Sequence, residues 1–307
     1  MERPGWYGHC QTGSGPDEID MKLGIFTKTF DRPNLGLVLD EVKSYGFGSV
    51  QFNIESAGGN PMPDHIDEEY ATGVREEMKL REIEMAAVSG TFNMIHPDPQ
   101  DRADGMRRFR EIVRACGWFG TSLVTLCTGT RDPDYMWAYH PENSSSEAWR
   151  DMIVSMVEAV RIAEDHGVIL VFETEVSNTV DSATKARKLL DEVQSPHLKV
   201  VMDGANLFPK GGLKRMREIL DEAFDLLGGD IAMAHAKDLE RDGEAGHVAA
   251  GTGLLDYDHY LNLLQGIGFD GALIAHSLRE DQVGESKIFL HETMDRVLVR
   301  SGGGEGE

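Results

Sequence analysis

Short apolar runs alternate with longer amphipathic segments from Met21 almost to the C-terminus. Runs of four or five apolar residues are typical of buried strands, whereas apolar residues three or four apart predict helices. The predicted strands are Lys22–Phe26, Ser49–Asn53, Met85–Val88, Ser122–Leu126, Val168–Phe172, Leu198–Met202, Ile231–Ala234 and Ala272–Ala275. The predicted helices are Leu35–Tyr45, Glu68–Glu84, Asp101–Gly117, Glu147–His166, Ser182–Val193, Leu213–Leu227, Tyr257–Gly266 and Ser286–Val299.

This alternation of strand and helix predicts an α/β fold, a (β/α)8 TIM barrel. The main alternative is an open, doubly wound sheet. No Gly-x-Gly-x-x-Gly follows the first strand, so the sequence offers no phosphate cradle of the kind that such sheets use. No linker of low complexity interrupts the pattern. We therefore expect a single barrel domain over residues 21–300, with a flexible arm over 1–20 and a flexible tail over 301–307.

The charge balance argues against polyanionic partners. The chain has 53 acidic and 30 basic residues, and its formal net charge is −23. Such a surface repels phosphate backbones and anionic lipids, which disfavours nucleic-acid and membrane binding. No apolar run is long enough to span a bilayer, and the first residues lack the pattern of a secretory signal. Because Cys10, Cys116 and Cys127 form no closely spaced framework, we expect a reducing compartment and a cytoplasmic protein.

Polar side chains directly follow the last four predicted strands. These residues are Glu173, Asp203, His235 and His276. The carboxyl ends of barrel strands meet at one rim, and a carboxylate or imidazole buried there without a partner is costly. One divalent cation would satisfy all four, since carboxylate oxygen and imidazole nitrogen suit Mn, Zn, Fe or Co. Taken singly, each carboxylate has the alternative of a helix cap or an ion pair, and His235 that of a core histidine.

The order of these residues resembles a known family. Glu173, Asp203 and the sequence His235-x-x-Asp238 are similar to the pattern of the xylose-isomerase-like superfamily of sugar (phosphate) isomerases and epimerases. The likeness runs from residue 22 to about 299, and the Gly-x-Gly sequence at 251–253 and the Gly-Phe-Asp-Gly sequence at 268–271 add to it. The resemblance implies that Glu173, Asp203 and His235 bind one divalent metal per chain, with manganese expected first and Co, Zn, Mg and Fe left open.

Two positions depart from the family pattern. The fourth ligand of the family is usually a Glu after the last strand, and His276 stands there in this chain. Histidine can ligate a metal or act as a base, but it puts a symmetric proton exchange between two glutamates in doubt. Where the family often has His after the strand-six Asp, this chain has Asn206, for which we expect a hydrogen bond to a sugar hydroxyl.

Further rim residues are candidates for substrate binding. Together with Asn206, they are Glu55, His96, His247 and Arg279. Glu55 has the alternative of a loop ion pair, and His96 that of a turn residue before proline. Lys237 would hold a substrate carboxylate, phosphate or enolate, or else form an ion pair with Asp238. Lys28 and Arg279 add positive charge at the rim, which favours an anionic or polyhydroxylated substrate.

The resemblance and the rim residues together predict a metal-dependent isomerase or epimerase that acts on a sugar, polyol or sugar phosphate. Glu173 would remove a proton next to the carbonyl, a metal-stabilised enediolate would form, and His276 or Lys237 would serve as the acid. A leaving group β to the carbonyl would turn the same chemistry into that of a lyase or dehydratase on a keto-sugar or keto-glycoside. A homo-oligomer is expected by resemblance alone.

Two further classes remain as alternatives. An endonuclease IV-like phosphodiesterase shares the barrel, but that family has an Asp-x-His pair where this chain reads Ala245-x-His247, and Asn206 replaces another of its zinc ligands. The other alternative is a non-catalytic barrel module whose metal site has decayed. His276, in place of the usual fourth Glu ligand, is the reason to consider it.

Overall fold

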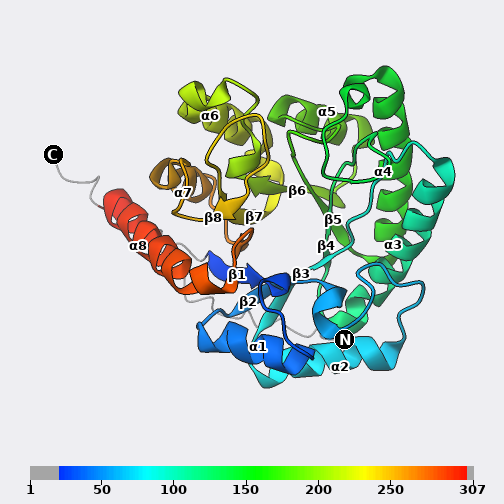
Figure 1. Cartoon of the computed structure of the whole chain (residues 1–307), viewed down its shortest axis with the longest axis horizontal. Helices are drawn as coiled ribbons and strands as arrows, with labels where there is room; N and C mark the ends of the chain where they lie inside the picture. Colours follow the sequence, from blue (N-terminus) through cyan, green and yellow to red (C-terminus); the bar gives the residue numbers. More distant parts are fainter. Residues whose placement is uncertain (1–20, 303–307) are drawn as a thin grey trace, which may run out of the picture.

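Eight parallel strands close into a barrel in the computed structural model, which describes residues 21–302 (Figure 1). The strands are β1 (Lys22–Phe26), β2 (Ser49–Phe52), β3 (Glu84–Ser89), β4 (Leu123–Leu126), β5 (Ile169–Glu173), β6 (Leu198–Asp203), β7 (Ile231–Asp238) and β9 (Ala272–Ala275). Neighbours in the chain pair in parallel, and the pairs β6–β7, β7–β9 and β9–β1 complete the ring. The predicted (β/α)8 barrel is confirmed.

Within residues 21–302, eight α-helices surround the strands (Figure 1). They are α1 (Leu35–Ser44), α2 (Glu68–Leu80), α3 (Pro99–Phe119), α4 (Ser146–His166), α5 (Ala183–Val193), α6 (Met216–Leu227), α7 (Tyr257–Gly266) and α8 (Val283–Gly302). Side chains cap several of their N-termini; the Ser145 hydroxyl, for example, accepts a hydrogen bond from the backbone N–H of Ala148 at the start of α4. Helix α4 ends at Gly167, whose φ of 65° suits glycine, as its sequence predicts.

The sequence-based boundaries differ from the structure at a few places. Glu84, predicted as the end of a helix, begins strand β3. A short strand, β8 (Val248–Ala249), pairs antiparallel with β7 and has no counterpart in the prediction. Helix α8 continues to Gly302, two residues into the segment expected as a tail. The expected arm over 1–20 and the remainder of the tail, 303–307, lie outside the described residues.

The core has two parts, one inside the barrel and one between the strands and the helices. The interior contains a cluster of fully buried side chains, namely Ala87, Val171, Val201, Met233 and Ile274. A larger cluster packs the outer face of the strands against the helices. Because side chains alternate between the two faces of a strand, most strands supply both clusters, whereas the alternate positions of β2 are the polar residues Ser49 and Gln51. This alternation also decides which residues point into the barrel mouth.

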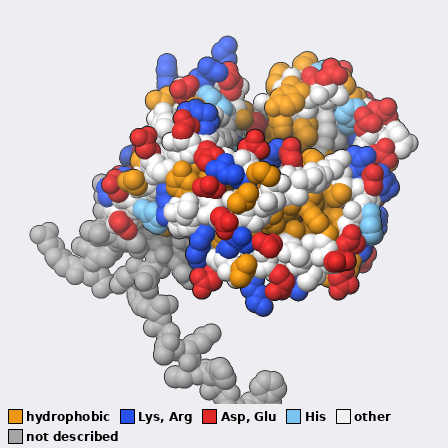
Figure 2. Space-filling view, turned by 60° about the horizontal axis from the view of Figure 1, so that its bottom comes forward, with side chains coloured by type: hydrophobic (Ala, Val, Ile, Leu, Met, Phe, Trp, Pro, Cys, Tyr) orange, Lys and Arg blue, Asp and Glu red, His pale blue; other side chains and the backbone are white. Residues whose placement is uncertain are grey.

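The surface carries acidic and basic side chains side by side (Figure 2). Many of them form ion pairs between neighbouring elements, such as Arg81 with Asp40 at 2.7 Å. Within the described part of the chain, no helix has the length and apolar character needed to cross a membrane. Cys116 and Cys127 are buried and unpaired.

Candidate metal centre and its cavity

The polar residues of the barrel mouth lie two positions beyond apolar residues of the barrel interior. On β5 the pair is Val171 and Glu173, and on β6 it is Val201 and Asp203. Strand β7 continues from Met233 to His235 and then to Lys237, the next inward position. Because a strand repeats its facing every two residues, these polar side chains form the layer above the apolar one. The period of the strands therefore brings them to one place.

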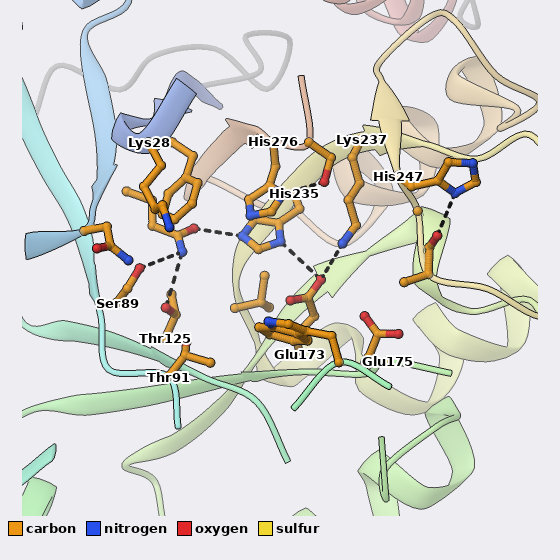
Figure 3. A pocket seen from close by; sticks show the side chains of 18 of the residues that line it. Lys28, Ser89, Thr91, Thr125, Glu173, Glu175, His235, Lys237, His247 and His276 are labelled. Carbon is orange, nitrogen blue, oxygen red and sulfur yellow. Dashed lines mark hydrogen bonds and ion pairs between the residues drawn. The ribbon is translucent and has the colours of Figure 1, made fainter. Parts of the chain in front are cut away.

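Three of the predicted ligands form a tight cluster. One ligand atom each of Glu173, Asp203 and His235 lies within 4.8 Å of the others. His235 Nδ1 is 3.4 Å from Glu173 Oε1 and 3.3 Å from Asp203 Oδ2. Lys237 Nζ is 3.1 Å and 2.9 Å from the same two oxygens, so two carboxylates, an imidazole and an ammonium meet at one point. Figure 3 shows Glu173, His235 and Lys237 of this cluster.

A chain of hydrogen bonds from the other side of the barrel orients His235. Gln51 on β2 donates from Nε2 to the hydroxyls of Ser89 (3.2 Å) and Thr125 (3.3 Å), so its Oε1 faces His235 Nε2 at 2.9 Å (Figure 3). Since an amide oxygen only accepts, His235 must carry a proton on Nε2. Its Nδ1 is then the nitrogen that faces the two carboxylates, which is the arrangement a metal ligand requires.

Burial and mutual attraction set the protonation of this cluster. Although burial opposes ionisation, the charges of Lys237 and His235 hold the pKa of Glu173 well below its usual range. Burial raises the pKa of Asp203, its close neighbour. Against the effect of burial, the negative charges of Glu173 and Asp203 raise the pKa of His235 to about 9. The carboxylates therefore attract positive charge strongly to this point.

Asn206 supports the cluster from below. It is fully buried and is not among the residues that line the cavity. Its Nδ2 donates to Glu173 Oε1 at 2.6 Å and lies 3.3 Å from Glu175 Oε2, while its Oδ1 accepts the backbone N–H of Gly246 at 2.8 Å. All its polar atoms are thus engaged within the protein, so it ties Glu173 to the loop after β7. Its predicted contact with substrate stays a prediction.

His276 reaches the mouth but stands apart from the three clustered ligands. Its ring stacks on His235 at 4.8 Å between centroids and on Phe26 at 4.9 Å. Its Nδ1 is 2.9 Å from the Ser277 hydroxyl. Burial and the charges of His235 and Lys237 hold the pKa of His276 well below 6.5, so the ring is neutral. The structure does not bring His276 into the ligand cluster, and its role as a fourth ligand stays a prediction.

A cavity of about 840 Å³ opens above the cluster. Glu173, His235, Lys237, His247, His276 and Arg279 line it. His247 Nδ1 lies 3.0 Å from the carbonyl oxygen of Ala245 in the loop after β7 (Figure 3). Arg279 is paired with Asp281 at 3.0 Å on the rim.

Two of the predicted substrate contacts are not among the residues that line this cavity. Glu55 is not among its lining residues and forms an ion pair with Lys28 at 2.6 Å. His96 lines an adjoining, smaller cavity of about 310 Å³, which shares Tyr135, Met136 and Trp137 with the larger one. Its Nε2 is 3.0 Å from the carbonyl oxygen of Pro133, and its Nδ1 accepts the backbone N–H of Asp98 at 3.1 Å.

The structure also shows site residues that the sequence analysis did not single out. Gln51, Ser89 and Thr125 are polar residues within or at the end of apolar strands, which was the available signal. Glu175, one strand repeat beyond Glu173, lines the cavity, and burial raises its pKa to about 7.

Asp238, at the end of β7, holds the backbone of the loop that follows this strand. Its carboxylate accepts backbone N–H groups of Leu239, Gly251, Gly253 and Leu255. A Cβ at Gly253 would lie 2.4 Å from Asp238 Oδ1, which explains this glycine. Asp238 therefore holds the loop after β7, while Lys237 pairs with Glu173 and Asp203 instead.

The residues present fit a divalent cation. Asp203 Oδ2 is fully buried and receives no hydrogen bond of acceptable geometry, although Lys237 Nζ lies near it. Two carboxylates and an imidazole whose Nδ1 faces them form a donor set that suits Mn, Co, Zn or Fe once a cation takes the place of the Nδ1 proton. Lys237 brings positive charge to the same oxygens that a metal ion would use. The described residues thus provide three ligands, and the metal they select is open.

Comparison with known families agrees with this geometry. A family model described as "Xylose isomerase-like TIM barrel" matches residues 39–292. A search of curated proteins by sequence finds no match.

Solved structures with the same fold are numerous. A D-tagatose 3-epimerase-like protein superposes with a TM-score of 0.73 at 17% identity, covering 92% of this chain and 100% of that one. The 3-keto-D-glucoside 4-epimerase of E. coli gives 0.67 at 14% identity, with 89% and 99% covered. A structure of the IOLI protein with a bound zinc atom gives 0.66 at 18%, with 91% and 99% covered. At these identities the likeness shows the fold.

Proposed function

The chain belongs to the xylose isomerase-like TIM-barrel family, and we propose that it is a divalent-metal-dependent isomerase or epimerase of a sugar or polyol. The observation that supports this most is the convergence of Glu173, Asp203 and His235 within 4.8 Å at the floor of a large cavity. Epimerases among the structures of the same fold, and a zinc-containing neighbour, support the same choice.

Glu173, Asp203 and His235 would hold the metal ion. When bound, a divalent cation would polarise the carbonyl and the adjacent hydroxyl of the substrate. Lys237 and His235 already bring positive charge to the two buried carboxylates, and Asp203 Oδ2, which receives no hydrogen bond, is an acceptor that a bound cation would satisfy.

Glu173 is the candidate base. It lines the cavity, its pKa is held low, and Asn206 fixes its Oε1 at 2.6 Å. A carboxylate so placed would take the proton from the carbon next to the carbonyl, and the bonding electrons would move to the carbonyl oxygen. Return of the proton to the former carbonyl carbon, with transfer of the adjacent hydroxyl proton to the former carbonyl oxygen, would complete an isomerisation. Return of a proton to the original carbon on its other face would complete an epimerisation instead.

Lys237 is the best-placed group to stabilise the charge that develops. Its Nζ lies 3.1 Å from Glu173 Oε1, on the cavity side of the cluster. An ammonium there would donate a hydrogen bond to the substrate oxygen as it becomes negative. His276, stacked between Phe26 and His235, would shape the floor beside it.

The second candidate is elimination of a group β to the carbonyl, by a lyase or dehydratase. Inversion at one carbon needs proton-transferring groups on both faces of the substrate, whereas elimination begins with one base. Strand β9 contributes the neutral ring of His276 and no carboxylate at its end, which favours this candidate over a reaction between two glutamates.

Solvent exchange tests the proposal. The chain loaded with Mn²⁺ would be incubated in D₂O with a panel of ketopentoses, ketohexoses and keto-glycosides, and deuterium incorporation followed by NMR. We expect incorporation next to the carbonyl of at least one substrate. If the substrate instead loses water and a new ultraviolet absorbance of a conjugated ketone appears, the reaction is the elimination. Absence of exchange and elimination across the panel, with metal bound, would refute the proposed function.

A further inference from the structure

The lining of the cavity is of two kinds. Charged residues of β5 and β7 form the part around Glu173, as described above. An apolar part comes from the loop between β4 and α4, whose residues Tyr135, Met136 and Trp137 all line the cavity, and from Pro61 and Met62 in the loop between β2 and α2. Tyr135 remains 62% exposed, so a large flat ring faces open space at the mouth. This apolar surface suits a flat, hydrophobic group beside the sugar.

The loop that carries these side chains is fixed to the barrel. The Thr130 hydroxyl donates to the carbonyl oxygen of Ala138 at 2.7 Å, and Asn178 Nδ2 donates to that of Met136 at 3.3 Å. Asp132 Oδ1 accepts the backbone N–H of Tyr135 at 2.8 Å. The aromatic segment is therefore held in place before any ligand arrives, which lowers the entropic cost of binding against it.

Positive charge in the cavity is already neutralised. The Lys and Arg side chains among its described lining residues each have a carboxylate partner. Lys28 pairs with Glu55 at 2.6 Å, Arg279 with Asp281 at 3.0 Å, and Lys237 with Glu173 and Asp203. Glu175 adds a further carboxyl group to the lining. Away from the metal cluster, a phosphate or carboxylate on the substrate would find no unpartnered Lys or Arg side chain among the described lining residues, which favours a ligand that is neutral outside its reacting group.

The size of the cavity also favours a ligand larger than a single sugar ring. At about 840 Å³ it lies near the upper end of the roughly 300–1,000 Å³ typical of pockets that bury drug-sized ligands. Such a volume accommodates a sugar ring together with a substituent of similar size.

From these observations we propose that the substrate is a neutral, unphosphorylated keto-glycoside whose flat aryl aglycone packs against Tyr135, Met136 and Trp137 while the keto group of its sugar ring lies at Glu173. This inference rests on the proposed function, because it assumes that the sugar occupies the metal-side part of the cavity. Aromatic rings stack with a favourable energy beyond their area burial, and the thioether of Met136 packs well against a ring edge.

Binding of non-reacting probes to the full metal-loaded chain tests the inference. The probes are phenyl D-glucopyranoside and methyl D-glucopyranoside, each as both anomers, and glucose 6-phosphate, with affinity measured by calorimetry. We expect one phenyl glycoside to bind about tenfold or more tighter than its methyl counterpart, because the aryl ring buries apolar area. Glucose 6-phosphate is expected to bind no better than the methyl glycoside.

Variants locate the contact. Trp137→Ala and Tyr135→Ala should each remove most of the preference for phenyl over methyl, and Tyr135 is exposed enough that its loss leaves the fold intact. Tyr139→Ala is the matched control, since Tyr139 lies in the same loop, is 64% exposed and does not line the cavity. The Tyr139→Ala variant should prefer the phenyl over the methyl glycoside by the same factor as the parent chain.

Three results would overturn the inference. They are an aryl preference that survives both Trp137→Ala and Tyr135→Ala, tighter binding of glucose 6-phosphate than of the methyl glycoside, and a disaccharide that binds as tightly as the phenyl glycoside. Because binding is measured without turnover, the two proposals fail separately. Solvent exchange on simple ketoses without aryl preference would remove only this inference, and aryl preference without exchange on any carbonyl substrate would remove only the proposed reaction.

Discussion

Two neighbouring layers inside the barrel are built on the same strands and have opposite chemistry. The lower layer contains Val171, Val201 and Met233, all with 0% exposure, and the upper layer contains Glu173, Asp203 and His235. Each upper residue lies one strand repeat, two positions, beyond its lower counterpart. The lower layer buries apolar area and stabilises the fold, whereas the upper layer gathers charges whose burial costs free energy. The residues that stabilise the barrel and those proposed to carry its function are thus two positions apart on the same strands.

The largest effect should come from the upper layer. Glu173→Gln keeps the shape of the side chain but removes the base and one negative ligand, so turnover in the exchange assay should fall by roughly 10²–10⁴-fold. The far-ultraviolet circular dichroism should not change. Glu84→Gln, at the opposite end of the barrel and paired with Lys22 at 2.6 Å, should retain full turnover. An active Glu173→Gln enzyme would remove Glu173 from the mechanism.

The lower layer should respond in stability instead. Met233→Ala leaves a cavity among Val171, Val201 and Ile274, and should lower the free energy of unfolding by about 2–5 kcal/mol. Ile288→Ala on α8, where the side chain is 60% exposed, should change it by less than about 0.5 kcal/mol. Chemical denaturation measures both. Equal effects would mean that Met233 is not part of a tightly packed layer.

Loss of the hydrogen bond between Gln51 and His235 should weaken metal binding. Gln51→Leu removes the acceptor that fixes the proton on His235 Nε2, and outer partners of this kind are typically worth about 10–100-fold in metal affinity. Competition with a chromophoric chelator measures the change. Gln100→Leu, on the exposed first turn of α3, is the control. Unchanged affinity in Gln51→Leu would mean that this hydrogen bond does not orient a ligand.

The smallest effect concerns a carboxylate at the other end of β7. Although burial opposes it, hydrogen bonds from Lys199 and Arg187 hold the pKa of Asp230 below its usual range. A depressed folded-state pKa contributes stability above the unfolded pKa of about 3.9, and that contribution is lost as the pH falls through the lower folded value. Asp230→Asn should therefore cost less than about 1 kcal/mol at pH 7 and progressively less below about pH 4. Denaturation at several pH values checks this, and a pH-independent difference would contradict it.

Much of the fold follows from the sequence because its periods are local. Strands β1 and β9 and helix α7 have the bounds that their apolar patterns predict. The clustering of Glu173 and Asp203 also follows, because each stands at the end of a strand and adjacent parallel strands end together.

The side-chain contacts of the candidate site depend on residues far apart in the sequence, which no local pattern specifies. Gln51 and His235 are 184 residues apart, so their hydrogen bond appears only when the barrel closes. The turn of the His276 ring onto Phe26, and the choice of Lys237 between Asp238 and the cluster, are set by side-chain packing in three dimensions. Position in a strand predicted which face these residues occupy but not what they contact.

Metal titration of stripped protein tests the central claim most directly. Mn²⁺, Co²⁺, Zn²⁺ or Mg²⁺ would be added while thermal unfolding and the bound stoichiometry are measured. If Glu173, Asp203 and His235 share one cation, at least one of these ions should raise the Tm with one ion bound per chain, since binding to the folded state stabilises it. Asp203→Asn should abolish the rise and Asp230→Asn should keep it. No rise with any ion, or the same rise in Asp203→Asn, would contradict the account.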